Sequence, residues 1–163
     1  CDKDLSLKDA IKFSCVWYYR ELARRIGADK MQEMLNAFNY GNKDISSGLD
    51  KFWLEGSIKI SQSEQIEFLK KLYKYELPVS KRSVDILKNI IVLDSTADHI
   101  MRGKTGWGFE DNTNIGWLVG WIEKSENVYF YAINVETDKD NPRFAESRRA
   151  ITEKIFRDFG VIK

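Results

Sequence analysis

Two apolar runs in the second half of the chain limit its fold most strongly. The runs "GWLVGWIEK" and "NVYFYAINVET", residues 116–124 and 127–137, are rich in aromatic and β-branched residues and meet at "SEN". Runs of this kind on either side of a short turn are typical of an antiparallel β-hairpin. We therefore expect a sheet here, with a further strand over 98–104 and a Gly-rich connection after it.

Helical spacing of apolar residues dominates the rest of the chain. Residues 5–27 are expected to form one helix or two short ones, with Gly27 as the C-cap. Further helices are expected within 28–48, with Asp29 as a cap, within 61–78, with Ser61 or Ser63 as a cap and Pro78 as a stop, and within 80–93 and 142–160.

This order predicts an α+β fold with helices packed on an antiparallel sheet. A chain of 163 residues is long enough to bury a core, and no linker or repeat divides it. We expect one domain over 1–163, with 1–95 mainly helical, sheet strands over 96–137 and a closing helix over 142–160.

Composition excludes several classes of partner. The 26 basic and 25 acidic residues nearly cancel, so no nucleic-acid partner is expected. No apolar run reaches the roughly 18 to 20 residues of a membrane span. Two cysteines, Cys1 and Cys15, and one histidine predict neither a disulfide framework nor a metal site.

The triplet Lys104-Thr105-Gly106 follows the expected strand 98–104. It offers a cation, a hydroxyl and a residue without a side chain, and this combination suits a carboxylated ligand that docks along a sheet edge. The alternative is an ordinary strand-to-turn junction, and three residues alone favour that alternative.

Three other short motifs have structural explanations when each is taken alone. Ser14-Cys15-Val16 lies in a helical pattern, where a buried hydroxyl commonly bonds the carbonyl four residues back. Tyr40-Gly41-Asn42 suits a helix end. Trp53, within Phe52–Gly56, suits an aromatic side chain that enters the core.

In their order and separations, "FSCV", "YGN", "FWLEGSIKIS" and "KTGW" resemble a class D (oxacillinase-type) serine β-lactamase, together with the closing helix that carries Arg148. The resemblance covers essentially the whole chain, and "SCV" takes the place of the S-D-N motif of related enzymes. It implies a serine β-lactamase or penicillin-binding transpeptidase-like fold, hydrolysis of β-lactam antibiotics and hence resistance, and a periplasmic or secreted location.

The resemblance also implies a role for each site residue. Ser14 would pass a proton toward the leaving nitrogen, Lys104 would stabilise negative charge, and the backbone N–H of Trp107 would form half of the oxyanion hole. The expected substrate-binding residues are Tyr40, Asn42, Thr105, Gly106 and Arg148. Among these, Thr105 and Arg148, chosen over Arg149, would hold the β-lactam carboxylate, and Tyr40, Gly41 and Asn42 would shape the cleft wall. Val16 and Trp53 would surround a lysine carboxylated by CO2, the one cofactor that the family implies; no metal is expected.

The family's nucleophile motif, Ser-x-x-Lys, is absent, because no serine in the chain has a lysine three residues later. The chain therefore resembles a C-terminal portion, with Cys1 as an interior residue. We expect it to be inactive alone, to expose a sheet edge and part of the core, and either to aggregate or to need a complementing N-terminal segment. Two alternatives remain open: a penicillin-sensing domain of a membrane receptor that stays acylated, and a remnant with a structural role.

Overall fold

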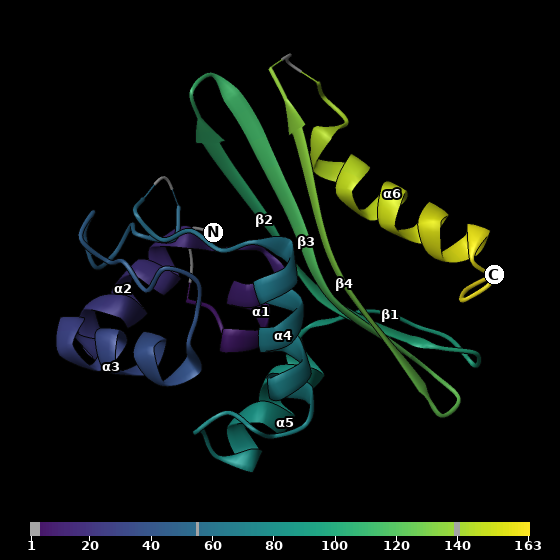
Figure 1. Cartoon of the computed structure of the whole chain (residues 1–163), viewed down its shortest axis with the longest axis horizontal. Coiled ribbons are helices and arrows are strands. Elements are labelled where there is room, and N and C mark those ends of the chain that lie inside the picture. The colour runs from purple at the N-terminus through teal and green to yellow at the C-terminus, as the bar shows by residue number, and fades with distance from the viewer. Residues whose placement is uncertain (1–3, 55, 139–140) are drawn as a thin grey trace. The chain divides into compact units, whose positions relative to one another are not determined.

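The computed structural model describes residues 4–54, 56–138 and 141–163 (Figure 1). Its helices and antiparallel sheet confirm the α+β class. Contacts group into two compact units, Cys1–Ile91 and Val92–Lys163, and the expectation of one domain over 1–163 stays a prediction. Among the described residues, no helix is long and apolar enough to span a bilayer.

The first unit is helical in its described residues. Its elements are α1 (Leu7–Lys12), α2 (Val16–Ile26), α3 (Ala28–Phe38), α4 (Gln62–Tyr73) and α5 (Lys81–Ile90). Residues 5–27 thus form two short helices, one of the two arrangements expected, and α2 ends at Gly27 as predicted.

The break between α1 and α2 has a local cause at Ser14. This residue has a left-handed backbone, with φ at 51°. The N–H of Ser14 donates to the carbonyl of Ile11 at 3.3 Å, and the N–H of Cys15 donates to that of Ala10 at 3.0 Å. These two bonds form a Schellman motif, which satisfies the last carbonyls of a helix and usually places glycine at the left-handed position. Ser14 therefore lies in a turn, and the expectation that it lies inside a helix was wrong.

Helix ends elsewhere follow the same chemistry. Ser61 caps α4 through a capping box, in which its Oγ accepts from the N–H of Glu64 at 3.2 Å and its N–H donates to the Glu64 carboxylate at 2.8 Å. Helix α4 ends at Tyr73, well before Pro78, because Tyr75 is left-handed and closes another Schellman motif. Asp29 is not the cap of α3; Gly27 is, and Asp29 lies in the first turn.

The second unit is a four-stranded antiparallel sheet with one helix. The strands are β1 (Val92–Ser95), β2 (Ile100–Glu110), β3 (Thr113–Lys124) and β4 (Asn127–Thr137), in the order β1-β2-β3-β4, and α6 (Phe144–Asp158) follows. The predicted hairpin over 116–137 is confirmed as β3 and β4.

Two strand assignments in this unit were wrong. The "VL" of 92–93 belongs to β1 and not to a helix, because it pairs with the start of β2. The Gly-rich segment after Lys104 is not a loop, because β2 continues to Glu110 and pairs with β3 along its whole length. The connection is only Asp111-Asn112, both with positive φ, as a tight hairpin turn requires.

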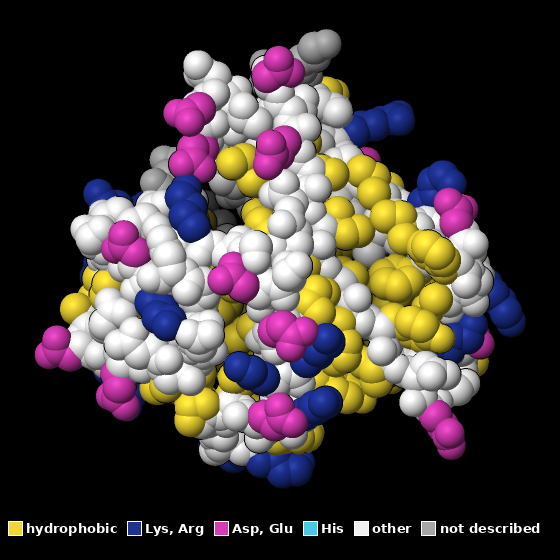
Figure 2. Space-filling model, in the orientation of Figure 1, with side chains coloured by type: hydrophobic (Ala, Val, Ile, Leu, Met, Phe, Trp, Pro, Cys, Tyr) yellow, Lys and Arg dark blue, Asp and Glu magenta, His cyan; other side chains and the backbone are white. Residues whose placement is uncertain are grey.

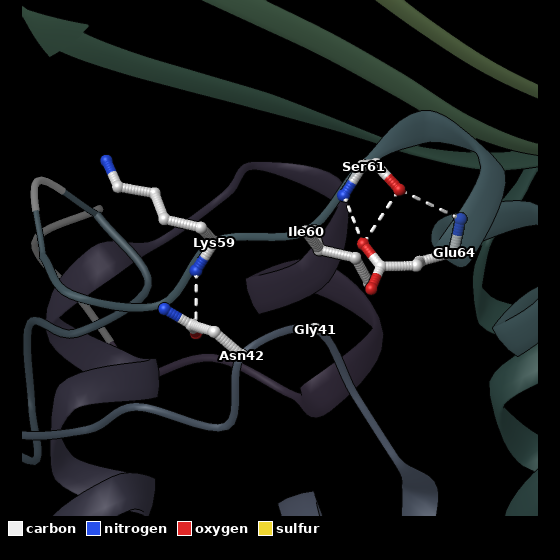
Figure 3. Close-up of a pocket in the computed structure, with 6 residues that line it drawn as sticks. All are labelled: Gly41, Asn42, Lys59, Ile60, Ser61 and Glu64. Carbon is white, nitrogen blue, oxygen red and sulfur yellow. Dashed lines mark hydrogen bonds between the residues drawn. The ribbon is translucent and has the colours of Figure 1, made fainter.

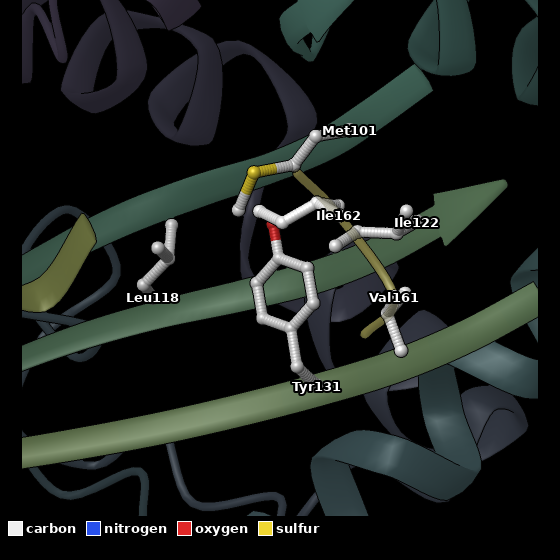
Figure 4. Close-up of a cluster of buried hydrophobic side chains, with 6 residues drawn as sticks. All are labelled: Met101, Leu118, Ile122, Tyr131, Val161 and Ile162. Atoms are coloured by element: carbon white, nitrogen blue, oxygen red, sulfur yellow. The ribbon is translucent and has the colours of Figure 1, made fainter. Parts of the chain in front are cut away.

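The core of this unit lies between the sheet and the residues that follow α6. Its buried members are Met101, Leu118, Ile122, Tyr131, Val161 and Ile162 (Figure 4). Phe156 of α6 packs edge-on against the ring of Tyr131, with 5.7 Å between ring centroids. Strands β2 and β3 and helix α6 are therefore fixed relative to one another, and these are the elements that carry Lys104 and Arg148.

Helix α6 also has an exposed apolar stripe. Ile151 and Ile155, and Phe159 just after the helix, follow one another at intervals of four residues and are 40%, 39% and 80% exposed. Figure 2 shows hydrophobic side chains gathered over the region of β4 and α6. Helical residues at this spacing share one face, so the stripe is a continuous apolar surface.

Candidate functional site

The triplet Lys104-Thr105-Gly106 lies in the middle of β2 and not at the end of a strand. On one side it pairs with β3, where Lys104 faces Val119 and Gly106 faces Trp117. On the other side, β1 pairs only with 100–102 of β2. Within the described strands of this unit, the second edge of β2 is therefore unpaired beyond Arg102, and the triplet lies on it. Such an edge presents backbone groups to which a ligand can hydrogen-bond.

Lys104 is a half-buried cation. Its Nζ donates to the carbonyl oxygen of Thr105 at 2.7 Å and approaches the Thr105 hydroxyl at 3.3 Å. Burial, and secondarily the nearby charge of Arg148, lower the pKa of Lys104 to about 8. Keeping the Lys104 ammonium group charged in this half-buried position therefore costs desolvation free energy, and a bound anion would offset that cost.

Arg148 is 6% exposed and lies beside this edge. Its guanidinium donates to the carbonyl oxygen of Gly106, and Nη2 and Nε donate to that of Ala145 at 3.0 and 3.2 Å. Burial lowers its pKa. No carboxylate of the described residues pairs with Arg148. The adjacent Arg149 is instead more exposed and bonds to Glu153 at 2.6 Å.

Trp107 lies next to the triplet and is 54% exposed. Its indole N–H donates to Oδ1 of Asn114 at 3.0 Å, and its ring packs edge-on against Phe144 at 5.3 Å. The Arg148 guanidinium lies 5.7 Å from the centre of the Trp107 ring, within the range of a cation–π contact. The structure thus brings Lys104, Thr105, Gly106, Trp107 and Arg148 together within one unit. Their roles toward a substrate stay predictions.

Three residues of the first unit come from the "SCV" motif. Ser14 is exposed and not buried, and it occupies the left-handed position of the turn between α1 and α2. Val16, the first residue of α2, is 40% exposed. Cys15 is buried and is disulfide-bonded, although the two cysteines predicted no disulfide framework. Cys1, and the expectation that it is an interior residue, lie outside the described residues.

Asn42 connects two loops of the first unit. Its Nδ2 donates to the carbonyl of Ser57 at 2.8 Å, and its Oδ1 accepts from the N–H groups of Lys59 and Asp44 at 2.9 and 3.2 Å. Gly41 has φ at 50°, and a Cβ there would lie 2.1 Å from the Lys59 carbonyl oxygen, so the loop requires glycine. The amide of Asn42 therefore has a structural role, whether or not it also contacts a substrate.

This loop forms one side of an open pocket of about 460 Å³. Figure 3 shows its lining, which is Gly41, Asn42, Lys59, Ile60, Ser61 and Glu64. Tyr40 precedes Gly41 in the chain, and its hydroxyl donates to Oε1 of Gln65 at 2.9 Å. Burial raises the pKa of Tyr40, although the bond to Gln65 opposes the rise. The prediction that 40–42 shape a cleft wall is compatible with this pocket and stays a prediction.

Trp53 is half-buried and packs edge-on against Phe52 at 5.0 Å. The family role of Val16 and Trp53 is to surround a carboxylated lysine. The chain has no Ser-x-x-Lys motif that would supply that lysine, so the residues present do not by themselves make a site for CO2.

Sequence reasoning missed Asn114 and Gly116, which contact the side chains of Trp107 and Arg148. The signal was present in "KTGWGFEDNTNIGW", because Asp-Asn at the centre of an apolar alternation indicates a hairpin turn. That turn fixes the register in which Trp107 faces Gly116.

Comparison with known proteins identifies the family. The model of the penicillin binding protein transpeptidase domain matches residues 1–159. The chain therefore belongs to the penicillin-binding transpeptidase family. The relatives found within it are class D β-lactamases, which confirms the resemblance of the four motifs and the transpeptidase-like fold.

Two curated relatives are the β-lactamases OXA-5 of Pseudomonas aeruginosa and OXA-48 of Klebsiella pneumoniae. Each is 43% identical over 99% of this chain. Among solved structures, a class D β-lactamase from Sebaldella termitidis is 40% identical with a TM-score of 0.95, and FUS-1 (OXA-85) from Fusobacterium nucleatum is 45% identical with a TM-score of 0.92, both over 99% of this chain. The chain spans 61% and 60% of the two curated relatives and 66% of each solved one.

Proposed function

We propose that this chain provides the carboxylate-binding side of a β-lactam site, in a protein that hydrolyses β-lactam antibiotics as a class D serine β-lactamase and so confers resistance. The observation that carries the proposal is the environment of Arg148. This guanidinium is buried, its described hydrogen bonds go only to carbonyl oxygens, and it lies beside Lys104 on an unpaired strand edge. A buried cation without a carboxylate partner favours an incoming anion.

The chemistry assigned to the described residues is recognition and charge stabilisation. Arg148 and the Thr105 hydroxyl would bind the carboxylate of the antibiotic, and Lys104 would stabilise negative charge nearby. The backbone N–H of Trp107 would donate to the developing oxyanion, and Ser14 would pass a proton to the leaving nitrogen. Tyr40 and Asn42 would line the cleft, and Val16 and Trp53 would surround a carboxylated lysine where such a lysine is present.

Covalent catalysis requires a nucleophile and its base together. Because the chain has no Ser-x-x-Lys motif, we propose that by itself it neither becomes acylated by penicillins nor hydrolyses them. The intact mass of the chain, measured before and after brief incubation with benzylpenicillin, tests this. The expected mass stays at 19.0 kDa, and a covalent adduct of one penicillin would contradict the proposal.

Recognition can be tested separately from catalysis. Titration of the isotope-labelled chain with benzylpenicillin, followed by NMR, should show weak binding. Arg148→Gln should lower the affinity by about tenfold, because a charge-assisted hydrogen bond is lost. Arg149→Gln is the matched control, since it removes an adjacent cation that bonds to Glu153. Equal losses in the two variants would contradict the assignment of Arg148.

A second proposal concerns the surfaces that the described residues leave open. The outer edge of β4 pairs with no described strand of this unit, and α6 exposes Ile151, Ile155 and Phe159. The solved relatives extend by a third of their length beyond the match. We propose that a complementing segment, expected at the N-terminal side, covers these surfaces. A chain that stays monomeric at high concentration, with a cooperative melt, would contradict this.

The disulfide at Cys15 supports a periplasmic or secreted location, because disulfides persist in oxidising compartments. Fractionation of expressing cells tests it. The penicillin-sensing alternative would use the same site, but the names of the relatives favour the hydrolase. Where a nucleophile segment is supplied, the lifetime of the penicillin adduct distinguishes the two: turnover supports the enzyme, and a persistent adduct supports the sensor.

A further inference from the structure

The aliphatic part of the Arg148 side chain lies over the sheet at Gly116. Gly116 faces Trp107 in the β2–β3 register, so both positions project to the same face of the sheet. A Cβ built on Gly116 would lie 2.8 Å from Cδ of Arg148 and 3.2 Å from its Cγ, and 2.9 Å from Cζ of Phe144. Real Cβ atoms do not approach carbon this closely. The course of the Arg148 side chain therefore depends on the absence of a side chain at 116.

The guanidinium at the far end of that side chain lies near the Trp107 ring, 5.7 Å from its centre. The ring is itself fixed at two points: its N–H donates to Oδ1 of Asn114 at 3.0 Å, and its edge contacts Phe144 at 5.3 Å. The aliphatic part of the Arg148 side chain thus packs at Gly116, and its guanidinium packs near the Trp107 ring.

We propose that Gly116 and the Trp107 side chain, with Asn114 holding the indole, are positioning residues that orient Arg148 for a carboxylate ligand. A long side chain that is already in its binding conformation loses less rotamer freedom when the ligand arrives. The identity of the ligand as a β-lactam carboxylate rests on the proposed function above; the positioning of Arg148 does not.

The direct test measures how well Arg148 is held in the unliganded 163-residue chain. Solvent exchange of its Nε–H, followed by NMR on labelled protein, should be about tenfold faster in Gly116→Ala and in Trp107→Leu, and less affected in Asn114→Ala. Trp107→Phe should restore part of the protection, because it keeps a ring under the cation. Phe109→Leu is the matched control for Trp107→Leu, since it removes another aromatic ring of β2, which is 49% exposed.

Each outcome supports or overturns the proposal. Faster exchange in Gly116→Ala and Trp107→Leu, but not in the control, supports it; unchanged exchange in both overturns it. If Gly116→Ala does not fold, as judged by its thermal melt, Trp107→Leu and Trp107→Phe decide the question. Titration with benzylpenicillin then separates the two proposals. If the chain without substitutions does not bind benzylpenicillin, the proposal that the ligand is a β-lactam is refuted, and the result on the positioning of Arg148 is unaffected.

Discussion

Lys104 should make the chain less stable at neutral pH than an uncharged residue of similar size. Lowering its pKa from 10.5 to about 8 corresponds to a cost of at most about 3 kcal/mol for holding the ammonium in the fold. Partial exposure reduces this cost, and the bonds of Nζ to Thr105 offset about 1 kcal/mol of it. We expect Lys104→Met to raise the free energy of unfolding at pH 7 by about 1 to 2 kcal/mol.

The pH dependence gives the sharper test. Below pH 8 the lysine is protonated in both folded and unfolded chains, so the cost is fully present. Between pH 8 and 10.5 the folded chain releases its proton first, and the stability of the unchanged chain rises with pH. Lys104→Met lacks this rise, so the stability difference between the two should shrink toward pH 10.5.

Urea unfolding of both proteins at pH 7 and at pH 9.5 measures the difference, and Lys154→Met, which removes a lysine with a 72% exposed side chain, is the control. A Met variant that is less stable at pH 7, or a difference that is the same at both pH values, would refute the reasoning.

Three further predictions concern stability and association. Tyr19→Phe should raise the free energy of unfolding by about 1 kcal/mol, since the Tyr19 hydroxyl is buried with no hydrogen-bond partner among the described residues and burial raises its pKa to about 12; a less stable variant in urea unfolding would show an undetected partner. Gly120→Ala should lower it by about 2 kcal/mol or more, because the new Cβ would lie 1.9 Å from the Arg102 carbonyl oxygen; an unchanged melting temperature would contradict the packing. Ile155→Ser combined with Phe159→Ser should reduce self-association of the chain in sedimentation, while changing the free energy of unfolding by less than about 1 kcal/mol. Unchanged association would show that the chain does not associate through the α6 stripe.

Sequence reasoning succeeded where the signal was local. Gly27 and Ser61 are caps because glycine permits a left-handed backbone and serine accepts from the first turn of a helix. It failed where a left-handed residue was not glycine. Ser14 and Tyr75 end α1 and α4, and their residue types do not indicate a left-handed backbone. Strand β1 was missed for a different reason, since four residues carry too little periodicity to separate a strand from the end of a helix.

For the site, the motifs indicated which residues matter but not how they are held. The choice of Arg148 over Arg149 came from the family pattern, and only the structure shows one of them buried against Gly106 and the other paired with Glu153. The contacts of Asn114 and Gly116 depend on a hairpin register that spans the turn at 111–112. Such contacts join residues distant in sequence, so residue types alone do not reveal them.

The left-handed Ser14 has an evolutionary consequence. At this position of a helix terminus, glycine would relieve backbone strain of about 1 kcal/mol, so a change to glycine would be favoured wherever folding alone is under selection. Such a change would delete the hydroxyl and leave the turn intact. If related sequences retain serine here, although glycine would be more stable, the hydroxyl is under selection. If glycine replaces serine in some relatives, selection for the hydroxyl has been lost in them.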